Sequence, residues 1–196
     1  MTRKQSAHAS QTTYRFLLSQ PLVLVGLMGS GKTAVGSRLA EQLQMPFIDS
    51  DHEIEAQAGL SIRDIFDIGG EAKFRDLEYR VMKRLMTEQP AIIATGGGAF
   101  CQPATRQLIA EHATSLWLDA SPEVLLSRIG DISTRPLLMS GDPLEILRRL
   151  AAERQDDYAQ ADLQLRTGHL RHQATLNKLL VLLEKNNIIA PKEDRT

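Results

Sequence analysis

Short apolar runs alternate with longer amphipathic stretches along most of this chain. The apolar runs lie at 22–25, 47–48, 91–95, 115–118 and 163–165. The stretches between them carry apolar residues at helical spacing. Strands and helices in this rhythm predict a parallel sheet that is covered on both faces. We therefore expect an α/β fold with three layers, α/β/α, around a five-stranded parallel sheet, with ligands at the carboxyl ends of the strands.

The two ends of the chain fall outside this alternation. Residues 1–20 hold Arg3, Lys4 and Arg15 but no acid, a composition shared by organelle transit peptides. The segment is short and lacks a secretory apolar core, so we expect a disordered tail there and a flexible tail at 189–196. Residues 21–188 then form a single domain, which suits a chain of 196 residues.

The composition and net charge limit the classes of partner that this chain is expected to bind. A net charge of -1 gives no general attraction to nucleic acid or to anionic membranes, and no apolar stretch approaches the ~20 residues that span a bilayer. The single cysteine, Cys101, excludes an internal disulfide, suits a reducing compartment and is interpreted as a small structural residue. We expect a cytoplasmic monomer that binds small molecules and has neither nucleic-acid nor membrane partners.

The segment GLMGSGKT at 26–33 follows the first apolar run and precedes an amphipathic stretch. Its spacing, Gly26, four residues, Gly31, Lys32 and Thr33, matches a phosphate-binding loop. Glycines let the backbone NH groups turn inward around an anion. Lys32 would then reach the β- and γ-phosphates, while the Thr33 hydroxyl would ligate Mg²⁺. The alternative, a strand-to-helix turn that binds nothing, fits this context less well.

The second apolar run continues into two acids, Asp49 and Asp51. In an extended segment, residues two apart face the same way, so both carboxylates could point at one ligand. One could hold hydrated Mg²⁺ and the other a substrate hydroxyl. Alternatively, one of them caps the helix that begins near His52.

In GGEAKFRDLEYRV, Gly69 and Gly70 are expected to break a helical segment, and Arg75 and Glu78 lie three residues apart after the break. The Arg75 guanidinium could grip a carboxylate as a bidentate fork, or it could form a solvated ion pair.

Three consecutive glycines at 96–98 end the third apolar run. They allow a ligand to lie directly on backbone NH groups, although a tight turn is the alternative.

The segment SRIGDISTRPLLMSGDP is rich in turn formers around Arg135. It predicts a mobile flap at about 130–143 that brings a cation onto a phosphoryl group, with an ordinary surface loop as the alternative. Arg128 just before it could stack on a purine. Arg154 lies near the end of the next helix, where a solvated charge is the default.

Taken in order, GSGKT, DSD, GGEAKFR, TGGGA and RPLL resemble the shikimate kinase family over about residues 22–187. The resemblance implies a P-loop kinase fold with a mobile lid. It also implies transfer of the γ-phosphoryl of ATP to the 3-hydroxyl of shikimate, with Mg²⁺, giving shikimate 3-phosphate and ADP on the route to chorismate and the aromatic amino acids.

The resemblance also assigns roles on the nucleotide side. The ATP phosphates would be held by the side chain of Lys32 and the backbone of Met28, Gly29, Ser30, Gly31, Lys32 and Thr33. Thr33 would ligate Mg²⁺ directly and Asp49 would do so through water. Arg135 would close over the phosphates, and Arg128 would pack on adenine.

On the acceptor side, the resemblance makes Asp51 the group that binds the shikimate hydroxyls and takes the proton of the attacking one. The carboxylate and ring substituents would be gripped by Arg75, Gly97, Gly98 and Arg154. Lys32, Asp51 and Arg135 would be catalytic.

One stretch departs from the family. After the last apolar run the chain reads RTGHLRHQA, so no adenine contact is assigned to 166–174, and His169 and His172 are expected to be solvated. Two other functions remain open: a related kinase such as a gluconate kinase, and a nucleotide-binding regulatory protein that has lost transfer chemistry.

Overall fold

The structure is a computed structural model that describes residues 14–130, 132, 136–168 and 172–192. Its main sheet is built from β2 (Leu22–Val25), β3 (Phe47–Asp49), β4 (Ile92–Ala94), β5 (Thr114–Asp119) and β6 (Leu163–Arg166). The strand order is β3-β4-β2-β5-β6, and every neighbouring pair is parallel. The predicted fold class, a five-stranded parallel sheet between helical layers, is confirmed.

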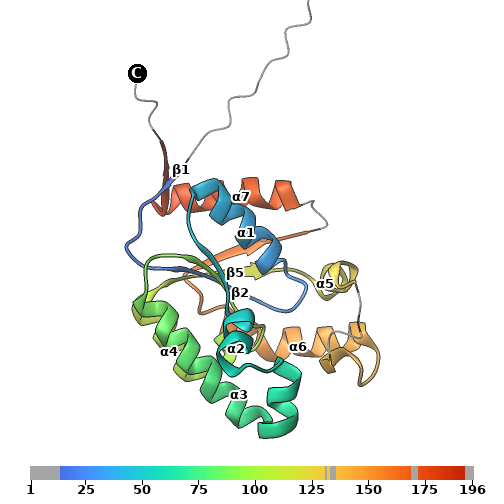
Figure 1. Cartoon of the computed structure of the whole chain (residues 1–196). Coiled ribbons are helices and arrows are strands. Elements are labelled where there is room, and N and C mark those ends of the chain that lie inside the picture. The colour runs from blue at the N-terminus through green and yellow to red at the C-terminus, as the bar shows by residue number, and fades with distance from the viewer. Residues whose placement is uncertain (1–13, 131, 133–135, 169–171, 193–196) are drawn as a thin grey trace, which may run out of the picture.

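The helices cover both faces of this sheet (Figure 1). They are α1 (Lys32–Leu43), α2 (Ser50–Ala58), α3 (Ile62–Thr87), α4 (Pro103–His112), α5 (Pro122–Arg128), α6 (Pro143–Tyr158) and α7 (His172–Lys185), with short 3₁₀ turns at Ala99–Cys101 and Pro136–Leu138. Within the described ranges, none of these helices combines the length and the apolar character needed to cross a membrane.

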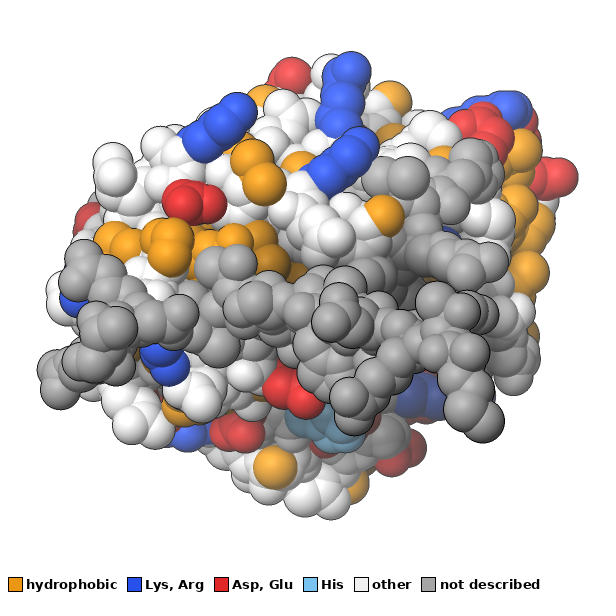
Figure 2. Space-filling model, turned by 90° about the horizontal axis from the view of Figure 1, so that it is seen from above, with side chains coloured by type: hydrophobic (Ala, Val, Ile, Leu, Met, Phe, Trp, Pro, Cys, Tyr) orange, Lys and Arg blue, Asp and Glu red, His pale blue; other side chains and the backbone are white. Residues whose placement is uncertain are grey.

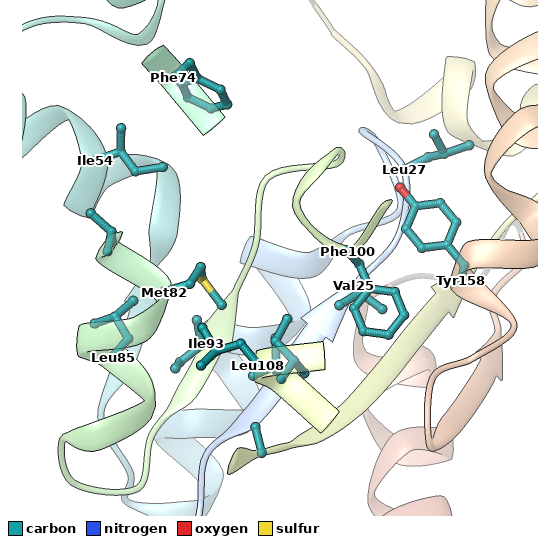
Figure 3. Close-up of a cluster of buried hydrophobic side chains, with 14 of the residues drawn as sticks. Val25, Leu27, Ile54, Phe74, Met82, Leu85, Ile93, Phe100, Leu108 and Tyr158 are labelled. Carbon is teal, nitrogen blue, oxygen red and sulfur yellow. The ribbon is translucent and has the colours of Figure 1, made fainter. Parts of the chain in front are cut away.

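Alternate residues of β2 face opposite layers, as the pleat of a strand requires. Leu22 and Leu24 pack with α1 and α7, whereas Val23 and Val25 pack with α3, α4 and α6. Figure 3 shows the second of these clusters, where side chains from the strands meet those of α3 and α4. All four β2 residues are fully buried. The sheet is therefore a rigid platform whose carboxyl edge holds the loops described below.

The helix α3 is broken where the two glycines were expected to break it. Gly70 has φ 69° and ψ -178°, which is not helical, so two helical pieces meet there. A residue with a side chain rarely adopts this φ, which is why glycine fits this position. The break separates the first turns of α3 from the piece that carries Arg75.

The chain ends differ from the prediction. β1 (Tyr14–Phe16) pairs with β7 (Ile189–Pro191) as an antiparallel two-stranded sheet, so the expected tails at 1–20 and 189–196 were wrong for these strands. Burial of apolar side chains explains the difference. Ile189 is buried, and Tyr14 and Phe16 pack against the hydrophobic cluster formed with α1 and α7. Residues 1–13 and 193–196 lie outside the described part of the chain, and the other domain boundaries remain predictions.

Figure 2 looks down on the molecule from above, where Figure 1 shows α1 and α7. Hydrophobic, basic and acidic side chains are interspersed on the part of this face that is coloured. No sign of charge dominates there, which agrees with a chain of net charge -1.

Candidate active site

The loop between β2 and α1 has a backbone that only glycine adopts readily. Gly26, Gly29 and Gly31 have φ angles of 134°, 77° and 96°. A Cβ at Gly26 would also lie 2.7 Å from the Leu118 carbonyl oxygen. Because L residues avoid both conditions, the spacing of glycines follows from the path of the loop. The expected strand, loop and helix context of a phosphate site is therefore present.

Lys32 begins α1 and folds back over this loop. Its Nζ donates to the carbonyl oxygens of Gly26 at 2.8 Å and Leu27 at 2.9 Å, and the residue is 9% exposed. The Lys32 ammonium is therefore held at the loop and does not extend freely into solvent. A charge held there can act on a phosphate without first being ordered.

Thr33 and Asp49 join the phosphate loop to the end of β3. Thr33 Oγ1 donates to Asp49 Oδ2 at 2.9 Å, and Asp49 Oδ1 accepts from the Asp51 backbone N at 3.1 Å. Asp49 therefore caps α2, as the alternative interpretation proposed, and also faces Thr33. A hydroxyl and a carboxylate suit Mg²⁺, which keeps waters and takes phosphate oxygens for its remaining ligands. Among the described residues, no group of three or more His, Cys, Asp or Glu could hold a metal by itself.

Asp51 faces a different neighbour. The extended segment that was expected to carry both acids ends at Asp49, because α2 begins at Ser50; whether the two carboxylates serve one ligand stays a prediction. Asp51 Oδ1 instead lies against the three-glycine loop: a Cβ at Gly96 would be 2.6 Å from it. The two acids are therefore divided between the phosphate loop and the loop after β4.

Arg75 is held by two carboxylates of unequal burial. Its Nη1 lies 2.7 Å from Glu78 Oε2, and the Glu78 side chain is 1% exposed. Its Nη2 lies 3.2 Å from Glu71 Oε1, which belongs to a largely exposed side chain. Burial raises the pKa of Glu78, and Arg75 opposes that shift. The alternative interpretation, a solvated ion pair, therefore fits Glu71 but not Glu78. The buried Glu78 carboxylate holds the Arg75 guanidinium from the protein interior.

The three-glycine loop lies between the phosphate loop and Arg75. A Cβ at Gly97 would be 3.4 Å from the Met28 backbone N, and a Cβ at Gly98 would be 2.7 Å from Arg75 Nη2. The missing side chains let the backbone touch both neighbours at once. The interpretation of these glycines as a tight turn alone does not account for this double contact.

Arg154 is not the solvated charge that its place on a helix suggested. Its Nη1 donates to the Gly97 carbonyl oxygen at 3.0 Å, across 57 residues of sequence. Two groups that the sequence did not single out hold the same loop. The Tyr158 hydroxyl donates to the Gly97 oxygen, and the Ser50 hydroxyl accepts from Gly96 N at 3.2 Å. The spacing of Arg154 and Tyr158, four residues apart on one helix face, was the available signal for Tyr158.

The two remaining arginines have different outcomes. Arg128 donates from Nη1 to the Ser30 carbonyl at 3.2 Å and from Nη2 to the Gly168 carbonyl at 2.5 Å. Burial lowers its pKa. It lies beside the phosphate loop, but its contact with adenine stays a prediction. Arg135 lies outside the described residues. In the described part of the expected lid, Leu138 is buried.

A family model described as shikimate kinase matches residues 28–184. The chain belongs to the shikimate kinase family. It is 47% identical over 172 residues to a shikimate kinase of Novosphingobium aromaticivorans, covering 86% of this chain and 89% of that one. It is 46% identical over 169 residues to a shikimate kinase of Caulobacter vibrioides, covering 86% of this chain and 84% of the relative.

Solved structures of a shikimate kinase and of a gluconokinase differ in their similarity to this chain. A shikimate kinase from Acinetobacter baumannii in complex with shikimate superposes with a TM-score of 0.81 at 36% identity, over 86% of this chain and 95% of that one. A gluconokinase from Sinorhizobium meliloti gives 0.54 at 19% identity, over 88% and 94%. The second likeness shows the fold alone. The recognition of the shikimate kinase family from the ordered motifs is confirmed.

Proposed function

We propose that this chain transfers the γ-phosphoryl group of ATP to the 3-hydroxyl of shikimate, giving shikimate 3-phosphate and ADP. One observation carries the proposal. An arginine fixed by a buried carboxylate lies against a three-glycine loop, and that loop touches the phosphate loop. This geometry supports a role for Arg75 as the cation that would bind the acceptor's carboxylate beside the nucleotide phosphates.

On the nucleotide side, the backbone of 28–33 and the Lys32 ammonium would bind the phosphates, and Arg128 would lie toward the adenine. Thr33 and, through water, Asp49 would hold Mg²⁺, whose positive charge would offset charge on the phosphates when bound. The 2.9 Å bond between Thr33 and Asp49 supports this pairing. Arg135 would add a second cation.

On the acceptor side, Arg75 and Arg154 would bind the shikimate carboxylate, while the Gly97 and Gly98 backbone supports the ring substituents. A carboxylic acid with three hydroxyls needs cations at one end and hydroxyl acceptors at the other. Asp51 would accept the proton of the 3-hydroxyl as its oxygen bonds to the γ-phosphorus. The bond from that phosphorus to the bridging oxygen breaks, and ADP leaves with the electron pair.

A coupled ADP-release assay tests the proposal. Shikimate, gluconate and nucleoside monophosphates are each offered with ATP and Mg²⁺, and ATP alone serves as the blank. We expect ADP release that depends on shikimate. Turnover with another acceptor but not with shikimate would favour a related kinase, and tight ATP binding without stimulation by any acceptor would favour a regulatory protein.

Three parts of the proposal have separate tests. Requirement for Mg²⁺ is measured by titrating the metal into the same assay after chelation. The expected monomer is checked by light scattering of the purified chain. A cytoplasmic location remains a prediction, to be checked by fractionation of the host cell.

A further inference from the structure

Tyr158 is the last residue of α6 and one of the largest fully buried side chains among the described residues. Its ring stacks on Trp117 of β5, with centroids 5.7 Å apart and 24° between the planes. Figure 3 shows its hydroxyl pointing toward Leu27 of the phosphate loop. The hydroxyl donates a hydrogen bond to the Gly97 carbonyl oxygen.

The Tyr158 hydroxyl keeps its proton and therefore stays able to donate. Burial raises the pKa of Tyr158 above its ordinary value, so the phenol keeps its proton in the neutral range. A buried tyrosine whose ring is locked by an aromatic neighbour can hold its partner in one direction. Here that partner is the carbonyl of the Gly97–Gly98 peptide, whereas further hydrogen bonds of the loop are made by Gly96 N, Gly96 O and Gly98 O.

The direction of the Gly97 carbonyl decides the direction of the next amide. In a planar trans peptide the C=O of Gly97 and the N–H of Gly98 point to opposite sides. Tyr158 and Arg154 hold the carbonyl from the α6 side. The Gly98 N–H is thereby turned away from α6, at the residue whose absent Cβ makes room for Arg75.

We infer that Tyr158 is a positioning residue that aims the Gly98 N–H at the acceptor and fixes the Arg154 guanidinium beside it. The inference rests on the proposed function, since it names the residue that orders the acceptor half of that same site. Without the hydroxyl, the Gly97 oxygen keeps Arg154 as its side-chain donor, and the peptide plane can turn. Part of the binding free energy of the acceptor is then used to order the loop, so the acceptor binds more weakly.

The test is Tyr158→Phe, which keeps the ring and its stack on Trp117. We expect the KM for shikimate to rise about 5- to 10-fold, the scale of one buried hydrogen bond, with the KM for ATP within about twofold of wild type. The matched control is Ser115→Ala. It removes another buried hydroxyl, which bonds to Asp162 at the amino end of β5. It should lower the melting temperature without raising the shikimate KM.

Equal changes in both KM values, or an unchanged shikimate KM, would overturn the inference. A second measurement needs no variant. In the wild-type chain labelled with ¹⁵N, titration with shikimate should shift the Gly98 amide resonance and slow its exchange with solvent. A Gly98 amide that does not respond to saturating shikimate would also overturn it. Absence of shikimate turnover by the wild-type chain would instead contradict the proposed function.

Discussion

The two halves of this site are built in different ways. The nucleotide half lies largely within eight consecutive residues, and its lysine is held by carbonyls five and six positions away. The acceptor half brings together α3, the loop after β4 and the end of α6, with the Arg154 contact spanning 57 residues. The first half is therefore a local motif, and the second exists only once the chain has folded.

This difference has a chemical counterpart. Phosphates carry several charges, so a loop of backbone NH groups and one lysine suffices to bind them. Recognition of one particular hydroxy acid needs a guanidinium held at a fixed angle, and the buried Glu78 provides that angle for Arg75. Damage to the first half should affect transfer, and damage to the second should affect the choice and affinity of the acceptor.

The largest expected effect is in the nucleotide half. Lys32→Met removes the charge at the phosphates and the bonds to Gly26 and Leu27, so we expect kcat to fall by about 10³-fold. Steady-state kinetics measures this loss. The control is Lys83→Met, because Lys83 is exposed on α3. Near-normal turnover by Lys32→Met would refute the phosphate-loop assignment.

The next effect is in the acceptor half. Arg75→Ala leaves the acceptor's carboxylate without its fork and leaves Glu78 as an unpaired buried charge. We expect shikimate binding to weaken by about 2 to 4 kcal/mol, roughly 30- to 1000-fold. Arg80→Ala is the control, since Arg80 lies on the same helix and pairs with exposed Asp76. If Arg80→Ala weakened shikimate equally, Arg75 would have no special place.

A smaller effect is expected from one added methyl group. In Gly98→Ala the new Cβ would lie 2.7 Å from Arg75 Nη2 and 3.1 Å from Nη1, so the guanidinium has to move. Because Glu78 restrains it, we expect the shikimate KM to rise about 10-fold while the ATP KM is unchanged. Initial rates measured with each substrate varied in turn give the two KM values. An unaltered shikimate KM would mean that the Arg75 guanidinium can move aside without loss of binding.

The smallest effect concerns stability and pH. Burial raises the folded-state pKa of Glu78 above the ordinary glutamate value of 4.5, so the folded chain binds this proton more tightly than the unfolded chain. The contribution of Glu78 to stability is then greatest below 4.5 and is lost as pH rises through the folded-state pKa. Glu78→Gln should therefore show a flatter fall in the free energy of unfolding above pH 4.5. Parallel curves for the two proteins would contradict this.

Sequence reasoning succeeded where structure is local. The phosphate loop, the break at Gly70 and the five parallel strands follow from spacing and periodicity. It failed where partners are distant. The spacing of Arg154 and Tyr158 puts them on one helix face but does not name Gly97 as their partner, and no periodicity reveals that β1 pairs with β7, because such contacts depend on how the layers pack. The expectation of an extended segment through Asp51 failed for another reason, since α2 begins immediately after the strand.

The central claim is that the two halves bind different ligands and can be damaged separately. Calorimetric titration of a non-hydrolysable ATP analogue and of shikimate into wild type, Lys32→Met and Arg75→Ala tests it most directly. We predict that Lys32→Met weakens the analogue at least about 10-fold and leaves the shikimate Kd within about twofold, and that Arg75→Ala does the reverse. Equal weakening of both ligands by either variant would contradict the division of the site.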